Sequence, residues 1–367
     1  MEISLRTLTP IWTGGVETGT MDRIHETGII GSLRWWYEAI VRGLGSDACD
    51  PTSHSCIYDP EKPNNGLCDV CQLFGATGWR RRFRLAVSNA NLEDAWSGGT
   101  INVKPPDRNR GWYLNSGKTG TFDLKIMGDE KAQAQVLTLI QFVSQWGSLG
   151  ARPQLGYGFV EIVDVRNPPS LSCNVWTEID QNQIGRSLPD LRTFTFFILD
   201  FEPQQNDWWR KVPGIRPLIS DNRYRNAVDN LTHHHMIPTT PALKNVLRYG
   251  TGWSSSALPH QFFGTLRGNE RRRGQIALSW AYQQKNSPIW RIRGWTYPPQ
   301  VELAQQQEIQ QRLQAVLGRP ETLLRALNIQ YRSATVSFAP ATTFFQPVTS
   351  KEIQSFVSEA SVTGVSA

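Results

Sequence analysis

CDPTSHSCIYDPEKPNNGLCDVCQLFGATGWRRRFR, residues 49–84, holds four of the five cysteines of the chain and one histidine, His54. Cys68 and Cys71 form a CxxC pair, and two intervening residues let both thiolates reach one tetrahedral zinc ion. Cys49, His54 and Cys56 then offer three candidates for the two remaining ligand positions. We favour the set Cys49, Cys56, Cys68 and Cys71, with His54 replacing one cysteine as the alternative.

A small core of reduced cysteines is the simpler interpretation of the same stretch. However, Pro51, Pro60, Pro63 and the run Asn64–Gly66 prevent regular structure, and few apolar residues are present to hold the segment together. A structural Zn²⁺ ion would supply that stability. We therefore expect a zinc-binding insertion at about residues 46–78.

The composition of the whole chain is typical of a globular protein. Its 367 residues are 39% hydrophobic and 19% charged, and they suffice for two domains of ordinary size. No apolar run approaches the roughly 18 residues of a membrane span, so no membrane partner is expected. The N-terminal MEISLRTLTP lacks the pattern of a signal peptide, which predicts a cytoplasmic location. Clustered cysteines in that reducing compartment favour metal binding over disulfides.

The order of elements in the first half predicts a ferredoxin-like (RRM-like) α+β domain over residues 1–166. Alternating apolar residues predict strands at 3–8, 83–87, 121–127 and 159–165. Apolar residues at helical spacing predict helices at 29–44 and 131–146. The resulting order is strand, helix, strand, strand, helix, strand, which is the ferredoxin-like order. The cysteine segment is inserted after the first helix.

The second half is expected to repeat this architecture without repeating its sequence. A proline-containing linker is predicted at 167–191, a second ferredoxin-like domain at 192–346, and a flexible tail at 347–367. Strands are predicted at 193–201, 275–282, 289–295 and 335–338, and helices at 242–247 and 302–317. A long irregular region is expected between the strand at 193–201 and the helix at 242–247. The predicted fold is therefore two tandem ferredoxin-like domains.

Positive charge points to a polyanion as the ligand. The net charge is +6 with a pI near 9.1, and arginine pairs with phosphate and stacks on bases. Some of the 14 tryptophans are candidates for stacking on unpaired bases, although core packing is the simpler role for any one of them. The candidate phosphate contacts are two clusters beside glycines and three single residues: Arg80, Arg81, Arg82 and Arg84; Arg267, Arg271, Arg272 and Arg273; Arg34, Arg42 and Arg152.

A glycine-rich loop, GARPQLGYG at residues 150–158, is a further candidate contact. Its glycines Gly150, Gly156 and Gly158 permit positive φ and close backbone approach, and Arg152 projects from the turn. The loop follows a helix and enters a strand, which is the reverse of a dinucleotide-binding turn.

Two groups of residues leave a catalytic role open. His233–His235 offer acid–base chemistry for RNA cleavage, a metal site or a polar loop, and no carboxylate near them in the sequence would orient them. Asp22 and His25 in the loop after the first strand offer the same chemistry. GxxxxGK[ST], GxSxG and HExxH motifs are absent from the sequence. A metal-independent endoribonuclease is therefore one alternative, and a scaffold that binds only protein neighbours is another.

Several motifs together resemble one family. They are the TGG loop after the opening strand and the segments GSLRWWYEAIVRG (31–43), CDVCQLFGATGW (68–79) and GARPQLGYG (150–158). This combination resembles the RAMP superfamily of CRISPR–Cas proteins, and within it the first subunit of the type III-B (Cmr) effector module. The resemblance is strongest from Met1 to about Val165 and continues more weakly from His260 to Trp295.

The resemblance implies two ferredoxin-like domains in a subunit that holds the 3′ region of a guide RNA. It also implies help in capturing complementary target RNA, other RAMP subunits as partners, and no catalytic role. Related subunits that cut target RNA use an aspartate in the loop after the first strand, where Asp22 lies here. The sequence therefore predicts a non-catalytic, zinc-stabilised, RNA-binding subunit of an RNA-guided antiviral defence complex. Base pairing by the guide would supply its sequence specificity.

Overall fold

The first half of the chain builds a four-stranded antiparallel sheet with the order β2–β5–β1–β6. The computed structural model describes residues 1–50, 55–106, 108–170, 189–250, 252–265 and 272–363. The strands are β1 (Glu2–Thr7), β2 (Phe83–Asp94), β5 (Lys118–Gly128) and β6 (Val160–Arg166), and the long helices are α1 (Glu26–Gly43) and α3 (Glu130–Trp146). Smaller elements are η1 (Pro63–Gly66), α2 (Asp69–Phe74), β3 (Ile101–Val103), β4 (Trp112–Leu114) and η2 (Pro153–Leu155). Each strand and helix predicted for this half is present, in the predicted order.

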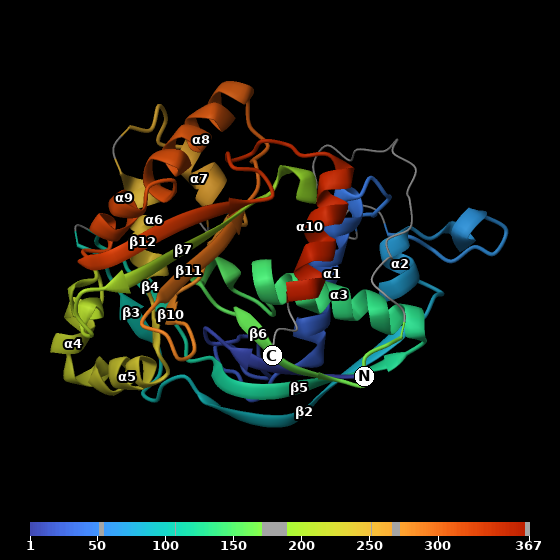
Figure 1. Ribbon diagram of the computed structural model, residues 1–367, viewed down its shortest axis with the longest axis horizontal. Helices are drawn as coiled ribbons and strands as arrows, with labels where there is room; N and C mark the ends of the chain where they lie inside the picture. Colours follow the sequence, from blue (N-terminus) through green and yellow to red (C-terminus); the bar gives the residue numbers. More distant parts are fainter. Residues whose placement is uncertain (51–54, 107, 171–188, 251, 266–271, 364–367) are drawn as a thin grey trace.

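Apolar patterning explains these elements. Ile3 and Leu5 of β1 are fully buried, while the residues between them face the other side of the sheet. In α1, Ile29, Leu33 and Trp36 lie at helical spacing and are buried. Asp129 caps α3, because its side chain accepts a hydrogen bond from Ala132 N at 2.9 Å. Figure 1 shows α1 and α3 on one side of the sheet formed by β2 and β5.

The second half forms a six-stranded antiparallel sheet with the order β12–β7–β11–β10–β8, and β9 pairs with β11. Its strands are β7 (Thr195–Pro203), β8 (Met236–Ile237), β9 (Ile276–Leu278), β10 (Ala281–Gln283), β11 (Trp290–Thr296) and β12 (Tyr331–Ala339). Its helices are η3 (Leu191–Thr193), η4 (Trp208–Lys211), α4 (Arg216–Ser220), α5 (Asn222–His233), α6 (Thr240–Tyr249), α7 (Leu258–Phe263), α8 (Leu303–Leu317) and α9 (Pro320–Ala326). The chain is thus an α+β protein built on antiparallel sheets.

The segment expected to be irregular contains the helices η4, α4 and α5, so that prediction is wrong. In α5 only Ala227, Val228 and Leu231 are buried, and this short apolar stripe is easily overlooked in a polar sequence. The N-terminus of α5 is nevertheless capped, because the Asp221 carboxylate accepts a hydrogen bond from Arg223 N at 3.0 Å.

The prediction of a flexible tail is also wrong, because this segment forms helix α10 (Ser350–Thr363). Thr349 and Glu352 build a reciprocal capping box: Thr349 N donates to Glu352 Oε2 at 2.7 Å, and Glu352 N donates to Thr349 Oγ1 at 3.3 Å. The Phe356 ring lies 5.8 Å from that of Phe142 and 5.1 Å from that of Trp146, both on α3. Figure 1 shows α10 beside α1 and crossing α3.

Aromatic residues join the two halves. The ring of Trp36 on α1 lies 5.2 Å from that of Trp295 on β11 and 6.1 Å from that of Phe196 on β7. Trp36, Trp96, Trp280 and Trp295 are among the largest fully buried side chains, so these tryptophans serve the core.

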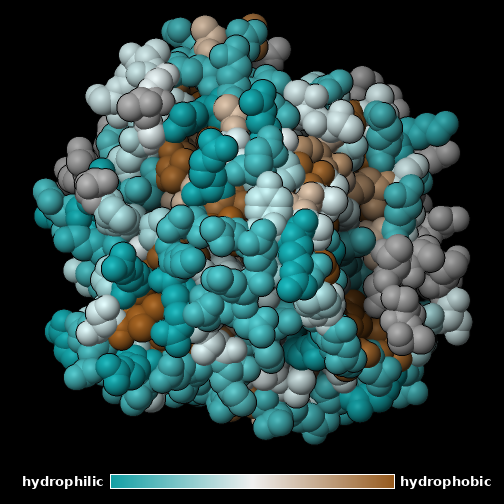
Figure 2. Space-filling model, turned by 60° about the vertical axis from the view of Figure 1, so that its left-hand side comes forward, coloured by the Kyte–Doolittle hydropathy of each residue, from teal (hydrophilic) through white to brown (hydrophobic). Residues whose placement is uncertain are grey.

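The surface offers no membrane-spanning element among the described residues. None of the helices in these ranges is long and apolar enough to cross a membrane. The face in Figure 2 is largely hydrophilic, and hydrophobic side chains gather there only in small separate patches.

Candidate metal centre and nucleic-acid interface

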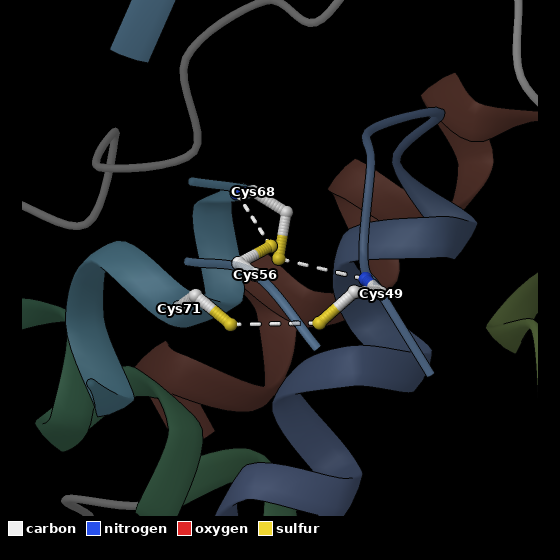
Figure 3. A group of neighbouring side chains, drawn as sticks. All are labelled: Cys49, Cys56, Cys68 and Cys71. Carbon is white, nitrogen blue, oxygen red and sulfur yellow. Dashed lines mark hydrogen bonds between the residues drawn. The ribbon is translucent and has the colours of Figure 1, made fainter. Parts of the chain in front are cut away.

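The four cysteines of the insertion converge on one point. The Sγ atoms of Cys49, Cys56, Cys68 and Cys71 all lie within 4.8 Å of one another, and Cys49 Sγ is 3.5 Å from Cys71 Sγ. Figure 3 shows the four sulfur atoms turned toward one another between α2 and the end of α1. Four thiolates around a tetrahedral zinc ion lie about 3.8 Å apart, given a Zn–S distance of ~2.3 Å. The cluster therefore has the donor set and the spacing to hold a metal ion.

Local structure fixes each sulfur atom. Cys68 is the N-cap residue of α2 and Cys71 lies in its first turn, so one short helix aims both side chains. Cys49 N donates to Cys68 Sγ at 3.5 Å, and Cys68 N donates to Cys56 Sγ at 3.4 Å. Such N–H groups around sulfur orient metal ligands and offset their negative charge.

Arg34 on α1 supports the cluster from the helix side. Its Nη2 donates to Cys71 Sγ at 3.3 Å, its Nη1 to Gly75 O at 3.2 Å, and its Nε to Glu38 Oε1 at 3.0 Å. A guanidinium beside a thiolate favours the ionised sulfur. Arg34 was predicted as a phosphate contact, and the structure engages it with the cysteine cluster.

The thiols of the cluster differ in acidity. A hydrogen bond from Cys71 is the main reason why the pKa of Cys68 is lowered to about 4, whereas burial raises the pKa of Cys49 to about 11. His54, the alternative ligand, lies outside the described residues.

A cleft of about 390 Å³ opens where the glycine-rich loop, α1 and the second half meet. Its floor is poor in side chains, because Gly28 and Gly31 of α1 and Gly150 of the loop line it. Ser32 Oγ accepts a hydrogen bond from Gly150 N at 2.9 Å and ties the loop to the helix. Small residues here allow a ligand to approach the backbone closely.

Two predicted arginines line this cleft from opposite halves of the chain. Arg152 lies with its guanidinium 3.9 Å from the ring centroid of Trp12 and donates to Asn115 Oδ1 at 2.8 Å. Arg273 is exposed, and its guanidinium lies 4.9 Å from the ring centroid of Trp35. Burial lowers the pKa of Arg152, but an arginine keeps its charge at any physiological pH. The cleft therefore combines two cations with an indole ring.

One further polar group at the cleft is unsatisfied. Trp295, whose side chain is buried in the wall, has an indole N–H without a hydrogen-bond partner in the described part of the chain. A buried donor without an acceptor is unfavourable.

The glycine-rich loop rests on the second half. Gly156 has φ +91° and lies so close to Trp280 and Thr240 that a Cβ atom would collide with both side chains. Trp280 Nε1 donates to Leu155 O at 2.8 Å, and the buried Lys244 donates to Gln154 O. The position of the loop, and of Arg152 within it, thus depends on contacts from the other half.

The remaining predicted arginines are placed differently. Arg42 is buried, with its guanidinium directed at the carbonyls of Ala48, Cys49 and Pro189, so a structural role replaces the predicted phosphate contact. Arg82 pairs with Asp129 at 2.7 Å, and Arg81 donates to Phe83 O at 2.8 Å. Arg80, Arg84 and Arg272 are exposed, while Arg267 and Arg271 lie outside the described residues.

Both candidate acid–base groups acquire carboxylate partners in the structure. His25 Nε2 lies 2.8 Å from Asp22 Oδ1, and this hydrogen bond lowers the pKa of the Asp22 carboxyl. His234 Nε2 lies 3.7 Å from Glu93 Oε1, and burial lowers the pKa of His234. His233–His235 line a second cavity of about 530 Å³ together with Arg6 and Lys285. Glu93 is distant in sequence, which is why sequence reasoning missed it.

Sequence reasoning also missed the part of α1 that lines the cleft. Four residues of α1 lie on one helical face at i, i+3, i+4 and i+7 spacing: Gly28, Gly31, Ser32 and Trp35. This stripe of small residues ending in an indole was the available signal.

Comparison with known proteins finds a family model that is similar to the first half of the chain. Residues 4–161 match the model of the RAMP superfamily. No curated protein sequence matches the chain. Among solved structures, Cmr1 from Pyrococcus furiosus in its apo form is 15% identical, with 82% of this chain and 90% of that chain covered and a TM-score of 0.41.

A chain of the type III-B Cmr-beta complex bound to cognate target RNA is 12% identical, with 86% and 98% covered and a TM-score of 0.39. The same complex with AMPPnP and single-stranded DNA present gives 12% identity, the same coverage and a TM-score of 0.37. TM-scores below 0.5 do not establish a shared fold. The match to the RAMP-superfamily model spans residues 4–161, which are the residues that build the first sheet.

Proposed function

We propose that the chain is a non-catalytic RNA-binding subunit of a type III-B CRISPR RNA-guided effector complex. The observation that carries this proposal is the cleft between the two halves, where Arg152 and Arg273 meet a glycine-lined backbone and the ring of Trp35. Cations that contact phosphate supply affinity without reading sequence. When the guide RNA supplies specificity by base pairing, the subunit needs only these phosphate contacts and no base-specific ones.

Within the complex, we propose that the chain contacts both RNAs and other protein subunits. The guide RNA, through its 3′ region, and the complementary target RNA would be its nucleic-acid ligands, and other RAMP subunits its protein neighbours. A cytoplasmic location is part of the same proposal.

Two structural details belong to the proposal. The ion at the cysteine cluster is Zn²⁺, because four thiolates at this spacing suit a structural zinc site. The two halves are tandem ferredoxin-like units. In the first sheet the first strand, β1, lies between the third, β5, and the fourth, β6; in the second sheet β7 lies likewise between β11 and β12.

RNA binding by the purified chain tests the cleft. Fluorescence anisotropy with a short single-stranded RNA should show tight, salt-dependent binding that Arg273→Gln weakens for every RNA sequence alike. Loss of one phosphate contact should reduce the slope of log K against log[salt] by about 0.7. Arg332→Gln is a matched control, because Arg332 is an exposed arginine on β12 paired with Glu202 at 3.0 Å. An effect of Arg273→Gln on one RNA sequence only would contradict the proposal.

The hydrogen bond between Asp22 and His25 favours a second candidate, a metal-independent endoribonuclease. A carboxylate that orients an imidazole at 2.8 Å is the arrangement of a general base. Incubation with labelled RNA in EDTA decides between the two candidates. Cleavage that disappears in Asp22→Asn and His25→Gln, but persists in Arg332→Gln, would replace the non-catalytic assignment.

A further inference from the structure

The metal-binding insertion holds an aromatic pair at its surface. The rings of Tyr58 and Trp79 are stacked, with centroids 5.4 Å apart and planes inclined by 21°. Tyr58 is 36% exposed and its neighbour Ile57 is 65% exposed. This pair differs from Trp36, Trp280 and Trp295, which are buried in the core.

Backbone contacts fix the pair before any ligand arrives. Trp79 Nε1 donates to Gln72 O on α2 at 3.1 Å, and Tyr58 N donates to Thr77 O at 3.0 Å. Between them Gly78 adopts φ +81°, and a Cβ atom there would lie 3.1 Å from Tyr58 Cβ. A surface aromatic pair that is held rigid loses little side-chain entropy on binding.

Uncompensated positive charge lies next to the pair. Arg80 directly follows Trp79 and is exposed, and neither its side chain nor that of the exposed Arg84 makes a hydrogen bond or ion pair with any residue that the structure describes. Residues 57–84 contain five basic and three acidic residues, so the segment is cationic. A protein neighbour would favour a broader apolar surface, whereas a rigid ring beside a free guanidinium suits a base and its phosphate.

We propose that the Tyr58–Trp79 pair is a stacking platform for an unpaired base of single-stranded RNA, with Arg80 contacting the adjacent phosphate. This inference rests on the proposed RNA-binding function but concerns a contact outside the cleft, since Tyr58, Trp79 and Arg80 do not line it. The cysteine cluster holds the segment that carries the platform. A metal ion bound at the cluster would therefore support RNA binding by keeping this segment folded.

The test uses the metal-loaded full chain and a single-stranded oligoribonucleotide with one 2-aminopurine. Stacking quenches 2-aminopurine, so the wild-type protein and Tyr58→Phe, which keeps the ring, should quench it. Tyr58→Leu should abolish the quenching and weaken binding roughly 5- to 100-fold, without changing the salt slope because no charge is altered. Arg80→Gln should reduce that slope by about 0.7. Tyr113→Leu is the control, because Tyr113 is an aromatic residue on β4 with 63% exposure.

Each outcome has a distinct meaning. If Tyr58→Leu binds RNA like the wild type while Arg273→Gln binds weakly, the platform is wrong and the cleft remains. If Tyr58→Leu instead loses a co-purifying protein subunit and keeps its RNA affinity, the pair is a protein contact and the inference is overturned. If the wild-type chain binds no RNA, the platform and the proposed function both fail. Metal content is measured for every variant, so that a misfolded insertion is recognised.

Discussion

Arg293 on β11 donates a hydrogen bond of 2.6 Å to Ser144 O near the C-terminal end of α3. The same buried guanidinium also donates to Gln145 O and to Val160 O, each at 2.9 Å. One side chain of the second half thus satisfies three carbonyl oxygens of the first. It adds a buried polar contact between the halves to those that Trp280 and Lys244 make with the glycine-rich loop.

Replacing Arg293 should therefore loosen the interface. Arg293→Met leaves buried carbonyls without donors, and we expect a loss of roughly 2–4 kcal/mol in the free energy of unfolding. Urea unfolding followed by tryptophan fluorescence measures it. Arg332→Gln, which removes an exposed ion pair, should cost less than about 1 kcal/mol. Equal losses in the two variants would show that the contact does not join the halves.

The glycine-rich loop should not tolerate a side chain at position 156. Gly156→Ala places a Cβ atom 2.6 Å from Thr240 Oγ1, against Trp280, at a φ of +91°. We expect destabilisation by more than about 1 kcal/mol and weaker RNA binding, because Arg152 shifts with the loop. In Gly31→Ala the new atom meets nothing within 4 Å on a helix, so the protein should become more stable by roughly 0.5–1 kcal/mol. Thermal unfolding compares the two variants, and a stable Gly156→Ala protein would contradict the contact.

Lys244 should make stability depend on pH. Burial lowers its pKa to about 7 from an ordinary value of 10.5. Between these two values the unfolded chain binds a proton that the folded chain does not, so the contribution of Lys244 to stability rises with pH in this window. Below pH 7 the full cost of burying the charge is present.

Comparison with Lys244→Met isolates this contribution. The variant should be more stable than the wild type near neutral pH, and the difference should shrink as the pH approaches 10.5. Urea unfolding at several pH values measures it, with Lys125→Met, a change at an exposed lysine, as a control. A constant difference for Lys244→Met would show that Lys244 keeps an ordinary pKa.

Removal of the metal should unfold the insertion and leave the rest of the fold. Cys71→Ser removes one of four sulfur ligands, and we expect loss of one bound zinc per chain and rapid proteolysis within residues 46–78. Cys173→Ser, which changes a cysteine remote in sequence from the cluster, should keep both the metal and the protease resistance. Elemental analysis and limited proteolysis provide the readouts. A full complement of zinc in Cys71→Ser would exclude that residue as a ligand.

Helix α10 should contribute to the core of the first half. Phe356→Ala removes a ring packed on Phe142 and Trp146, and we expect a loss of roughly 3–5 kcal/mol. Gln354→Ala changes a neighbouring exposed residue and should have little effect. Chemical denaturation of both variants checks this, and a silent Phe356→Ala would restore the expectation of a loose tail.

Local sequence patterns predicted the elements whose formation depends mainly on residues close together in the sequence. Alternation in β1 and helical spacing in α1 and α3 gave these elements their correct places, and the CxxC pair marked two of the four converging sulfur atoms. The TSKE capping box at Thr349–Glu352 was also local, but the small and polar residues around it concealed the helix.

Relationships between distant segments were not predictable from the sequence. The sequence predicted Arg42 as a phosphate contact, whereas in the fold its guanidinium donates to the carbonyls of Ala48, Cys49 and Pro189. The cleft likewise brings Arg152 and Arg273 together across more than a hundred residues of sequence. Both examples depend on tertiary packing, which residue periodicity does not encode.

The position of α10 has a consequence for biosynthesis. Ile353 and Phe356 complete a core whose other members, on α1 and α3, are translated more than two hundred residues earlier. While the second half is being made, this part of the first half exposes aromatic surface that a chaperone would recognise. The N-terminal half therefore reaches its final packing only after α10 has emerged from the ribosome.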